Sequence, residues 1–208
     1  MKFHRFTLSI AVMTLLSGVA FAQNHAEMQK EAAAKSEALK SDMHKSVENA
    51  APSDAQKSFD QLKTLAGTWQ GTLTTDPPNP EIDGAHPQIT LRVTSRGNAI
   101  VHEMKEAGTP DDAAKYDHPV TMLYVDSGRL TLVHYCDAGN RPRMTAKASP
   151  DGKKVEFEFQ DLSGGNDYGH MHHAVFTVID ENHHTEDWTY MMPGDKPMHA
   201  HMDLTRKN

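Results

Sequence analysis

The sequence predicts an all-β protein, an antiparallel up-and-down β-barrel of about ten strands with an N-terminal helical extension. From Thr68 onward, apolar and polar residues alternate with a period of two, which is typical of strands with one buried face. Short turns such as Asp126-Ser127-Gly128 and Pro193-Gly194-Asp195 separate these segments and require neighbouring strands to be antiparallel. Closing into a barrel would hide the two edge strands, and a two-sheet sandwich is the alternative.

The first segment of the 208-residue chain is typical of a signal peptide. Lys2 and Arg5 precede an apolar run that extends from Phe6 to Val19, and Ala20-Phe21-Ala22 has the small-x-small pattern that signal peptidase cuts. We therefore expect residues 1–22 to be removed and the protein to be periplasmic or secreted. Because the apolar run is too short for a stable membrane span, we expect no membrane insertion after cleavage.

A stretch rich in Ala, Glu and Lys follows, and we assign residues 23–57 to a helical or flexible spacer. It contains an EAAAK unit, which favours a semi-rigid helix. Its apolar residues form one thin stripe that is too narrow to be buried well. We interpret the segment as a solvated spacer, with a partner-binding helix as the alternative, and place the barrel domain at residues 58–208.

Composition excludes several classes of function. The chain has 21 Lys+Arg against 28 Asp+Glu and a formal net charge of −7, so nucleic acid is not an expected partner. Cys136 is the single cysteine, so no intrachain disulfide can form, and we interpret it as an inert thiol. The sequence has no hydrolase-type serine motif, phosphate loop or dinucleotide fingerprint, which favours a protein that is not an enzyme, although the sequence does not decide whether it catalyses a reaction.

Ten strands are expected in the barrel domain, after a short amphipathic turn. A long proline-rich connection between residues 74 and 88 would fit a mobile loop at the mouth of a cavity. The predicted strands span residues 68–75, 88–95, 98–106, 120–126, 129–136, 143–149, 153–161, 170–180, 185–192 and 197–206.

The start of the domain, Gly67-Thr68-Trp69 after a short helix, resembles the Gly-x-Trp opening of lipocalins and the wider calycin barrels. In those families the tryptophan plugs the closed end of the barrel, and a basic residue on the last strand packs over it. The resemblance implies that Trp69 and Arg206 close one end here. The segments LTLVHYCDAGNRPRM and GHMHHAVFTVIDENHHTEDWTY are also similar to uncharacterised exported bacterial proteins with a lipocalin-like domain.

Strand alternation predicts which histidines point inward. His102 has the same parity as Ile100 and Met104, and His134 has that of Leu130 and Leu132. In the same way, His170 and His172 share the parity of Ala174, Phe176 and Val178. On the last strand, alternation places His199 and His201 outside, and we assign His183 and His184 to a turn.

The aromatic pair Trp188 and Tyr190 is expected to line the interior beside Ala200. This pairing requires an odd number of residues in the hairpin loop around Pro193-Gly194-Asp195, because an even number would place Trp188 opposite His201.

We expect the barrel to bind a small, partly apolar molecule. The predicted ligand-binding residues are His102, Met104, Met122, His134, His172, Phe176, Trp188 and Tyr190. The alternative is a metal or haem centre on His134, His170 and His172, with or without catalytic activity. A third hypothesis is an interaction module in which the N-terminal helix is the functional part. The sequence identifies neither a cofactor nor an oligomeric state.

Overall fold

The computed structural model describes residues 27–40, 51–112, 114–148 and 153–207. The chain divides into two units between Ala51 and Pro52, and each is described by itself. Residues 27–40 form a helix whose side chains are all exposed, which confirms the helix predicted before the barrel. The predicted signal peptide, residues 1–22, lies outside the described residues. Among the described residues, no helix is both long and apolar enough to cross a membrane.

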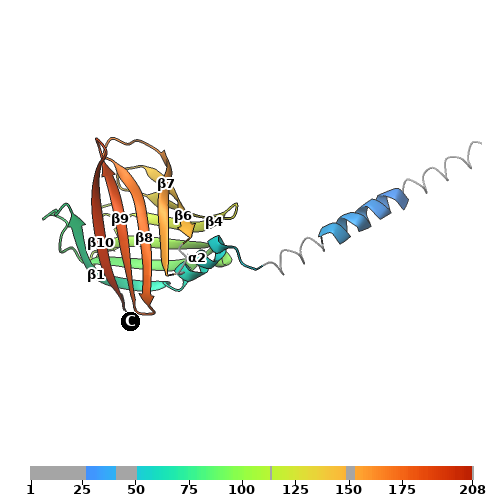
Figure 1. The fold of residues 1–208 in the computed structure, drawn as a ribbon, viewed down its shortest axis with the longest axis horizontal. Helices are drawn as coiled ribbons and strands as arrows, with labels where there is room; N and C mark the ends of the chain where they lie inside the picture. Colours follow the sequence, from blue (N-terminus) through green and yellow to red (C-terminus); the bar gives the residue numbers. More distant parts are fainter. Residues whose placement is uncertain (1–26, 41–50, 113, 149–152, 208) are drawn as a thin grey trace, which may run out of the picture. The chain divides into compact units, whose positions relative to one another are not determined.

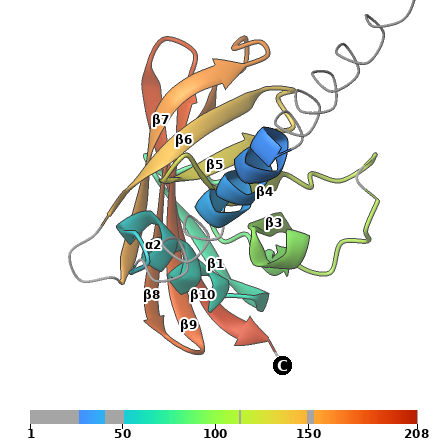
Figure 2. The same cartoon turned by 90° about the vertical axis from the view of Figure 1, so that its right-hand side faces the viewer.

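The second unit is a closed barrel of ten antiparallel strands, which confirms the predicted fold (Figures 1 and 2). Neighbours in sequence are neighbours in the sheet, and β1 pairs with β10 to complete the ring. Each predicted strand is present, with ends no more than two residues from those predicted. The strands are β1 (Gly67–Asp76), β2 (Pro87–Thr94), β3 (Ala99–Glu106), β4 (Val120–Asp126), β5 (Arg129–Tyr135), β6 (Arg141–Ala148), β7 (Lys154–Ser163), β8 (His170–Asp180), β9 (His183–Met192) and β10 (Lys196–Lys207).

A short helix, α2 (Asp54–Lys63), covers one end of the barrel. Ser53 caps it by accepting a hydrogen bond from the Gln56 N–H at 3.2 Å. The helix packs against β4, β5 and β6, and its buried residues Phe59 and Leu62 belong to the hydrophobic core. We call this end, where β1 begins, the closed end, and the opposite end, where β3 ends and β4 begins, the open end.

Trp69 and Arg206 seal the closed end, as predicted. Trp69 is fully buried, and its indole N–H donates to the carbonyl of Leu65 at 2.8 Å. The two residues are register partners on β1 and β10, and the guanidinium lies 4.1 Å from the centre of the indole ring. Arg206 also donates to the carbonyls of Ala66 at 2.8 Å and Thr64 at 3.1 Å. The last strand is therefore tied to the segment that follows α2.

The junction of β1 and β10 depends on a glycine. Gly71 lies opposite Leu204, and a Cβ at Gly71 would lie only 1.7 Å from the carbonyl oxygen of Asp203. Glycine at this position lets the two strands approach closely enough to close the barrel.

The register of β4 corrects one predicted site residue. Thr121 pairs with His102 on β3 and with His134 on β5, so these three side chains share the inner face. Met122 therefore faces outward beside Val101 and the prediction that it lines the interior is wrong. The alternation in β4 could not decide the face, because both sets of alternate residues are largely apolar.

A bulge in β8 corrects a second prediction. The register with β9 shifts between Met171 and His173, so that Met171 pairs with Tyr190 and packs against the core. Met171, and not His170, therefore continues the inward face of Phe176 toward the open end. His170 pairs with Met191 instead.

Candidate functional site

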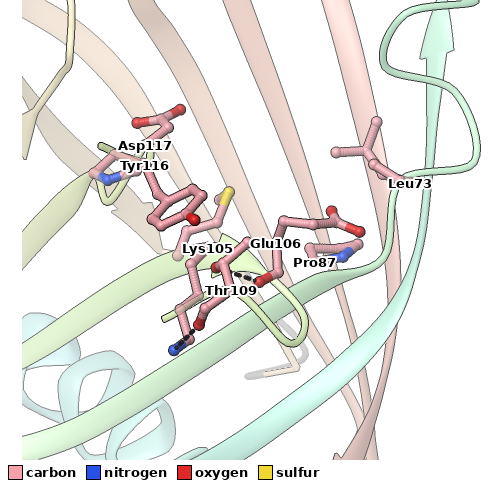
Figure 3. Close-up of a pocket in the computed structure, with 10 residues that line it drawn as sticks. Leu73, Pro87, Lys105, Glu106, Thr109, Tyr116 and Asp117 are labelled. Carbon is pink, nitrogen blue, oxygen red and sulfur yellow. Dashed lines mark hydrogen bonds between the residues drawn. The ribbon is translucent and has the colours of Figure 1, made fainter. Parts of the chain in front are cut away.

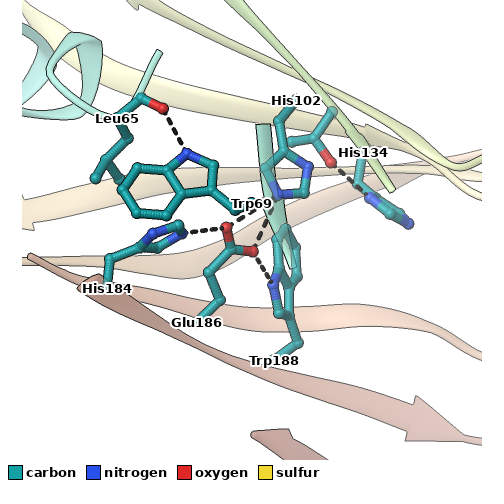
Figure 4. Close-up of polar contacts among 8 residues, drawn as sticks. Leu65, Trp69, His102, His134, His184, Glu186 and Trp188 are labelled. Carbon is teal, nitrogen blue, oxygen red and sulfur yellow. Dashed lines mark hydrogen bonds and ion pairs between the residues drawn. The ribbon is translucent and has the colours of Figure 1, made fainter. Parts of the chain in front are cut away.

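A fully buried carboxylate, that of Glu186 on β9, lies at the centre of the barrel (Figure 4). It accepts hydrogen bonds from Nε2 of His102 at 3.0 Å and from Nε2 of His184 at 3.1 Å. The indole N–H of Trp188 donates to it at 3.0 Å. We call Glu186, His102, His184 and Trp188 the central network. Because a carboxylate can only accept, both histidines carry a proton on Nε2.

The histidines of the central network keep the Glu186 carboxyl ionised. Burial alone would raise the pKa of the Glu186 carboxyl, but His102 and His184 outweigh this effect and hold the pKa well below its usual range. Glu186 is therefore ionised at neutral pH. Nδ1 of His102 and Nδ1 of His184 are buried without a hydrogen-bond partner among the described residues.

His134 lies next to this network, toward the open end. Its Nδ1 is 2.8 Å from the hydroxyl of Thr121, and its ring centre is 5.6 Å from that of Trp188. Burial lowers the pKa of His134 to about 4, with a further contribution from His102, while Asp137 acts in the opposite direction. His134 is therefore neutral at physiological pH.

Two members of the central network, His184 and Glu186, are not among the residues predicted from the sequence. His184 was assigned to a turn, but it lies in β9, is fully buried and packs its ring edge-on against Trp69. Glu186 was not considered, because a charged residue in a strand usually faces water. Strand alternation does indicate that both side chains point inward, since both residues share the parity of Trp188 and Tyr190.

The middle of the barrel is filled by side chains rather than open to a ligand. His102, His134, Phe176 and Trp188 are at most 2% exposed. The predicted inward direction of these four side chains is confirmed, as is the pairing of Trp188 with Ala200. They contact one another, however, through rings whose centres are 5.6 to 5.9 Å apart. Binding of a ligand among them would require this packing to open.

A pocket of about 240 Å³ lies at the open end (Figure 3). Met104 is the predicted ligand-binding residue that lines it, while Ala85 and Pro87 come from the end of the proline-rich connection. That connection therefore lies at a cavity mouth, as expected, and Asp83 ties it down by accepting from the backbone N–H of Thr75 at 2.6 Å. The pocket is lined by Leu73, Ala85, Pro87, Met104, Lys105, Glu106, Thr109, Tyr116, Asp117 and Pro119.

Two charged side chains of the pocket wall are already paired. Lys105 donates to the carbonyl of Thr109 at 3.0 Å and forms an ion pair with Asp111 at 2.5 Å. Glu106 accepts from the backbone N–H of His86 at 3.2 Å. Their charges are therefore largely satisfied within the protein, and both side chains are held in place.

Asp117 is the remaining acidic group of the wall, and it faces another carboxyl. Burial raises the pKa of Asp117 to about 7, and a hydrogen bond that protonated Asp117 donates to Asp137 and the charge of Asp137 add to the effect. Among the described residues, Asp117 forms no ion pair with a basic side chain. Figure 3 shows Tyr116 and Asp117 on one side of the pocket and Leu73 on the other.

The three histidines predicted as metal ligands are not brought together. His170 and His172 are 3.1 Å apart between Nε2 and Nδ1, at the open end of β8. Among the described residues, the group of three ligand-type side chains with atoms within 4.8 Å of one another is Glu156, Glu158 and His173. His134 thus does not complete a three-nitrogen site with the pair in this structure.

The remaining predicted residues lie near the surface. Tyr190 is half-buried at the open end and donates to the carbonyl of Tyr168 at 2.7 Å. His199 and His201 face outward, as predicted, and Nδ1 of His201 is 2.6 Å from the carboxylate of Asp187. Burial raises the pKa of the half-buried Cys136, which agrees with its interpretation as an unreactive thiol.

Comparison with solved structures shows the fold and no more. Rv2717c from M. tuberculosis matches with a TM-score of 0.52 and 14% identity, over 77% of this chain and 100% of that one. A protein of unknown function from the DUF3598 family of Nostoc punctiforme matches with a TM-score of 0.48 and 10% identity, over 70% of this chain and 48% of that one. No protein-family model matches the sequence, and no curated protein matches it. The closed ten-stranded barrel fits a calycin-like architecture.

Proposed function

We propose that this protein is an exported barrel that binds a small, partly apolar molecule in the pocket at its open end. The observation that carries the proposal is the pocket itself, which lies above a sealed interior and has a mainly apolar wall formed by β1, β2, β3 and the loop before β4. A cavity of about 240 Å³ is slightly below the usual size of sites for drug-sized ligands, so the ligand is small.

The wall also indicates the chemistry of the ligand. Leu73, Pro87 and Met104 offer apolar contacts, and the ring of Tyr116 offers a face for stacking. Lys105 and Glu106 are already paired, whereas Asp117 lacks a basic partner among the described residues. A ligand with an apolar body and one hydrogen-bond donor directed at Asp117 would be complementary to this wall.

Titration with a neutral naphthalene fluorophore such as Prodan tests the proposal on the full chain. We expect saturable binding of one probe per barrel, with a blue shift of its emission. Leu73→Trp would fill the pocket and weaken binding by about 10-fold or more, and Tyr116→Ala would weaken it by about 2- to 10-fold through loss of the ring contact.

Tyr135→Ala is the matched control, because Tyr135 is also an exposed tyrosine but does not line the pocket. Its binding constant should equal that of the wild type. Binding without saturation, or equal binding by the wild type and Leu73→Trp, would overturn the assignment of this pocket.

Export is a separate part of the proposal and rests on residues 1–22. Expression of the full chain in a Gram-negative host should yield a periplasmic protein that begins at Gln23, as measured by its intact mass. Recovery of the uncleaved chain from the cytoplasm alone would contradict export and would leave the pocket to be judged by the titration.

A further inference from the structure

A pair of histidines at the open end, outside the proposed pocket, is in direct contact through ring nitrogens. His170 and His172 lie at the start of β8, where the bulge between Met171 and His173 interrupts the regular strand. In a regular strand, the Cα atoms of residues i and i+2 are about 6 to 7 Å apart. Here the two imidazoles are in contact, with Nε2 of His170 only 3.1 Å from Nδ1 of His172.

The protonation of the pair is set by a neighbouring amide. Nδ1 of His170 is 2.9 Å from the side-chain oxygen of Asn166, which can only accept a hydrogen bond. A neutral His170 therefore carries its proton on Nδ1 and directs the lone pair of Nε2 toward His172. Donation of the second ring N–H to a fixed acceptor is the usual support of a metal-binding histidine. His170 is 7% exposed, and its burial lowers its pKa, with a further contribution from His172.

The surroundings hold both rings in place. The ring of Phe159 stacks on His172 with centres 4.7 Å apart and an angle of 18°, and it lies 4.8 Å from the ring of His170. The loop before β8 is anchored by the buried side chain of Asn140, which donates to the carbonyl of Gly169 at 2.7 Å. A Cβ at Gly169 would lie 2.3 Å from the carbonyl oxygen of Met191, so this position needs glycine.

We propose that His170 and His172 bind one divalent first-row metal ion through Nε2 of His170 and Nδ1 of His172. Two metal–nitrogen bonds of about 2.1 Å at a right angle place their nitrogens about 3.0 Å apart, close to the 3.1 Å observed. Imidazole ligands at right angles suit nickel or copper, with water in the remaining positions. His172 gives up its Nδ1 proton and takes one on Nε2, and its half-buried ring swings out of the hydrogen bond so that its Nδ1 lone pair meets that of Nε2 of His170 at the metal.

Calorimetric titration of the full chain with Ni²⁺ tests this site. We expect His172→Ala to remove one equivalent of bound Ni²⁺, or to weaken its binding at least 10-fold. Asn166→Ala should weaken the same equivalent by about 10-fold or more, because it removes the acceptor that fixes the His170 tautomer. His172 is half-buried, so its replacement is expected to leave the barrel folded, which circular dichroism would verify.

Two control variants separate this site from other metal-binding groups. His201→Ala removes an outward histidine that is held by Asp187, and His173→Ala removes the histidine of the Glu156–Glu158–His173 group. Both should retain the equivalent that His172→Ala loses. The proposal is overturned if His172→Ala binds Ni²⁺ like the wild type, or if the equivalent disappears in His173→Ala and remains in His172→Ala.

Discussion

The neutral, buried His134 makes the stability of the barrel depend on pH. Its pKa is about 4 in the folded protein against a usual value of 6.5. Between these values the unfolded chain binds more protons than the folded one, so stability is lost as the pH falls from about 6.5 toward 4. With 1.36 kcal/mol per pKa unit, this single group lowers the free energy of unfolding by about 2 kcal/mol between pH 7.5 and pH 5.

The test compares the wild type with His134→Asn by urea unfolding at both pH values. Asparagine keeps a polar atom near the hydroxyl of Thr121 but does not titrate. When the pH falls from 7.5 to 5, we expect the free energy of unfolding to decrease by about 2 kcal/mol less in the variant than in the wild type. This difference corresponds to about 4 to 8 °C in Tm.

His201→Asn is the matched control, because His201 is an exposed histidine on the outer face. Subtracting each variant's own unfolding free energy at pH 7.5 removes the cost of the substitution itself. If His134→Asn loses as much stability on acidification as the wild type, His134 is not held neutral by burial and the reasoning fails.

Three further predictions concern the interior and the closure of the barrel. Glu186→Gln leaves the His102, His184 and Trp188 donors without a carboxylate and should lower the free energy of unfolding, measured in urea, by about 3 to 5 kcal/mol. The control Glu103→Gln changes an exposed residue and should alter this free energy by less than about 0.5 kcal/mol. Equal stability of the two variants would exclude a structural role for the Glu186 charge. Arg206→Leu should lower the free energy of unfolding by about 2 to 4 kcal/mol, because it removes three hydrogen bonds to backbone carbonyls and the contact with Trp69, and an unchanged Tm would contradict it. Gly71→Ala should yield little folded protein by circular dichroism, since its Cβ would overlap the Asp203 carbonyl, and a wild-type yield would refute the close approach.

The fold was predictable because alternation and turn lengths constrain a barrel strongly. The three residues between Met192 and Lys196 are one example: an odd loop was required to pair Trp188 with Ala200, and this pairing is observed. Closure by Trp69 and Arg206 followed from a resemblance and from the parity of β10, and both are confirmed.

The site was less predictable, for reasons that differ from residue to residue. The face of Met122 was ambiguous because both faces of β4 carry apolar side chains, and the pairing with β3 and β5 decided it. His170 lies on the far side of a bulge, and no residue pattern marks a one-residue shift in register. Glu186 was missed although its parity was correct, because a buried carboxylate becomes stable only with partners that other strands supply.

The central network also explains why the proposed ligand site lies near the surface of this barrel. A buried carboxylate that loses one of its donors costs several kcal/mol, so a ligand entering between His102 and Trp188 would have to replace those hydrogen bonds as well as displace packed rings. The pocket beside Met104 and the His170–His172 pair lie on the other side of this barrier, where polar groups can exchange partners with water. Substitutions at the open end should therefore change binding with little effect on stability, and substitutions in the central network should do the reverse. A variant of Glu186 that retained stability but lost probe binding would contradict this division.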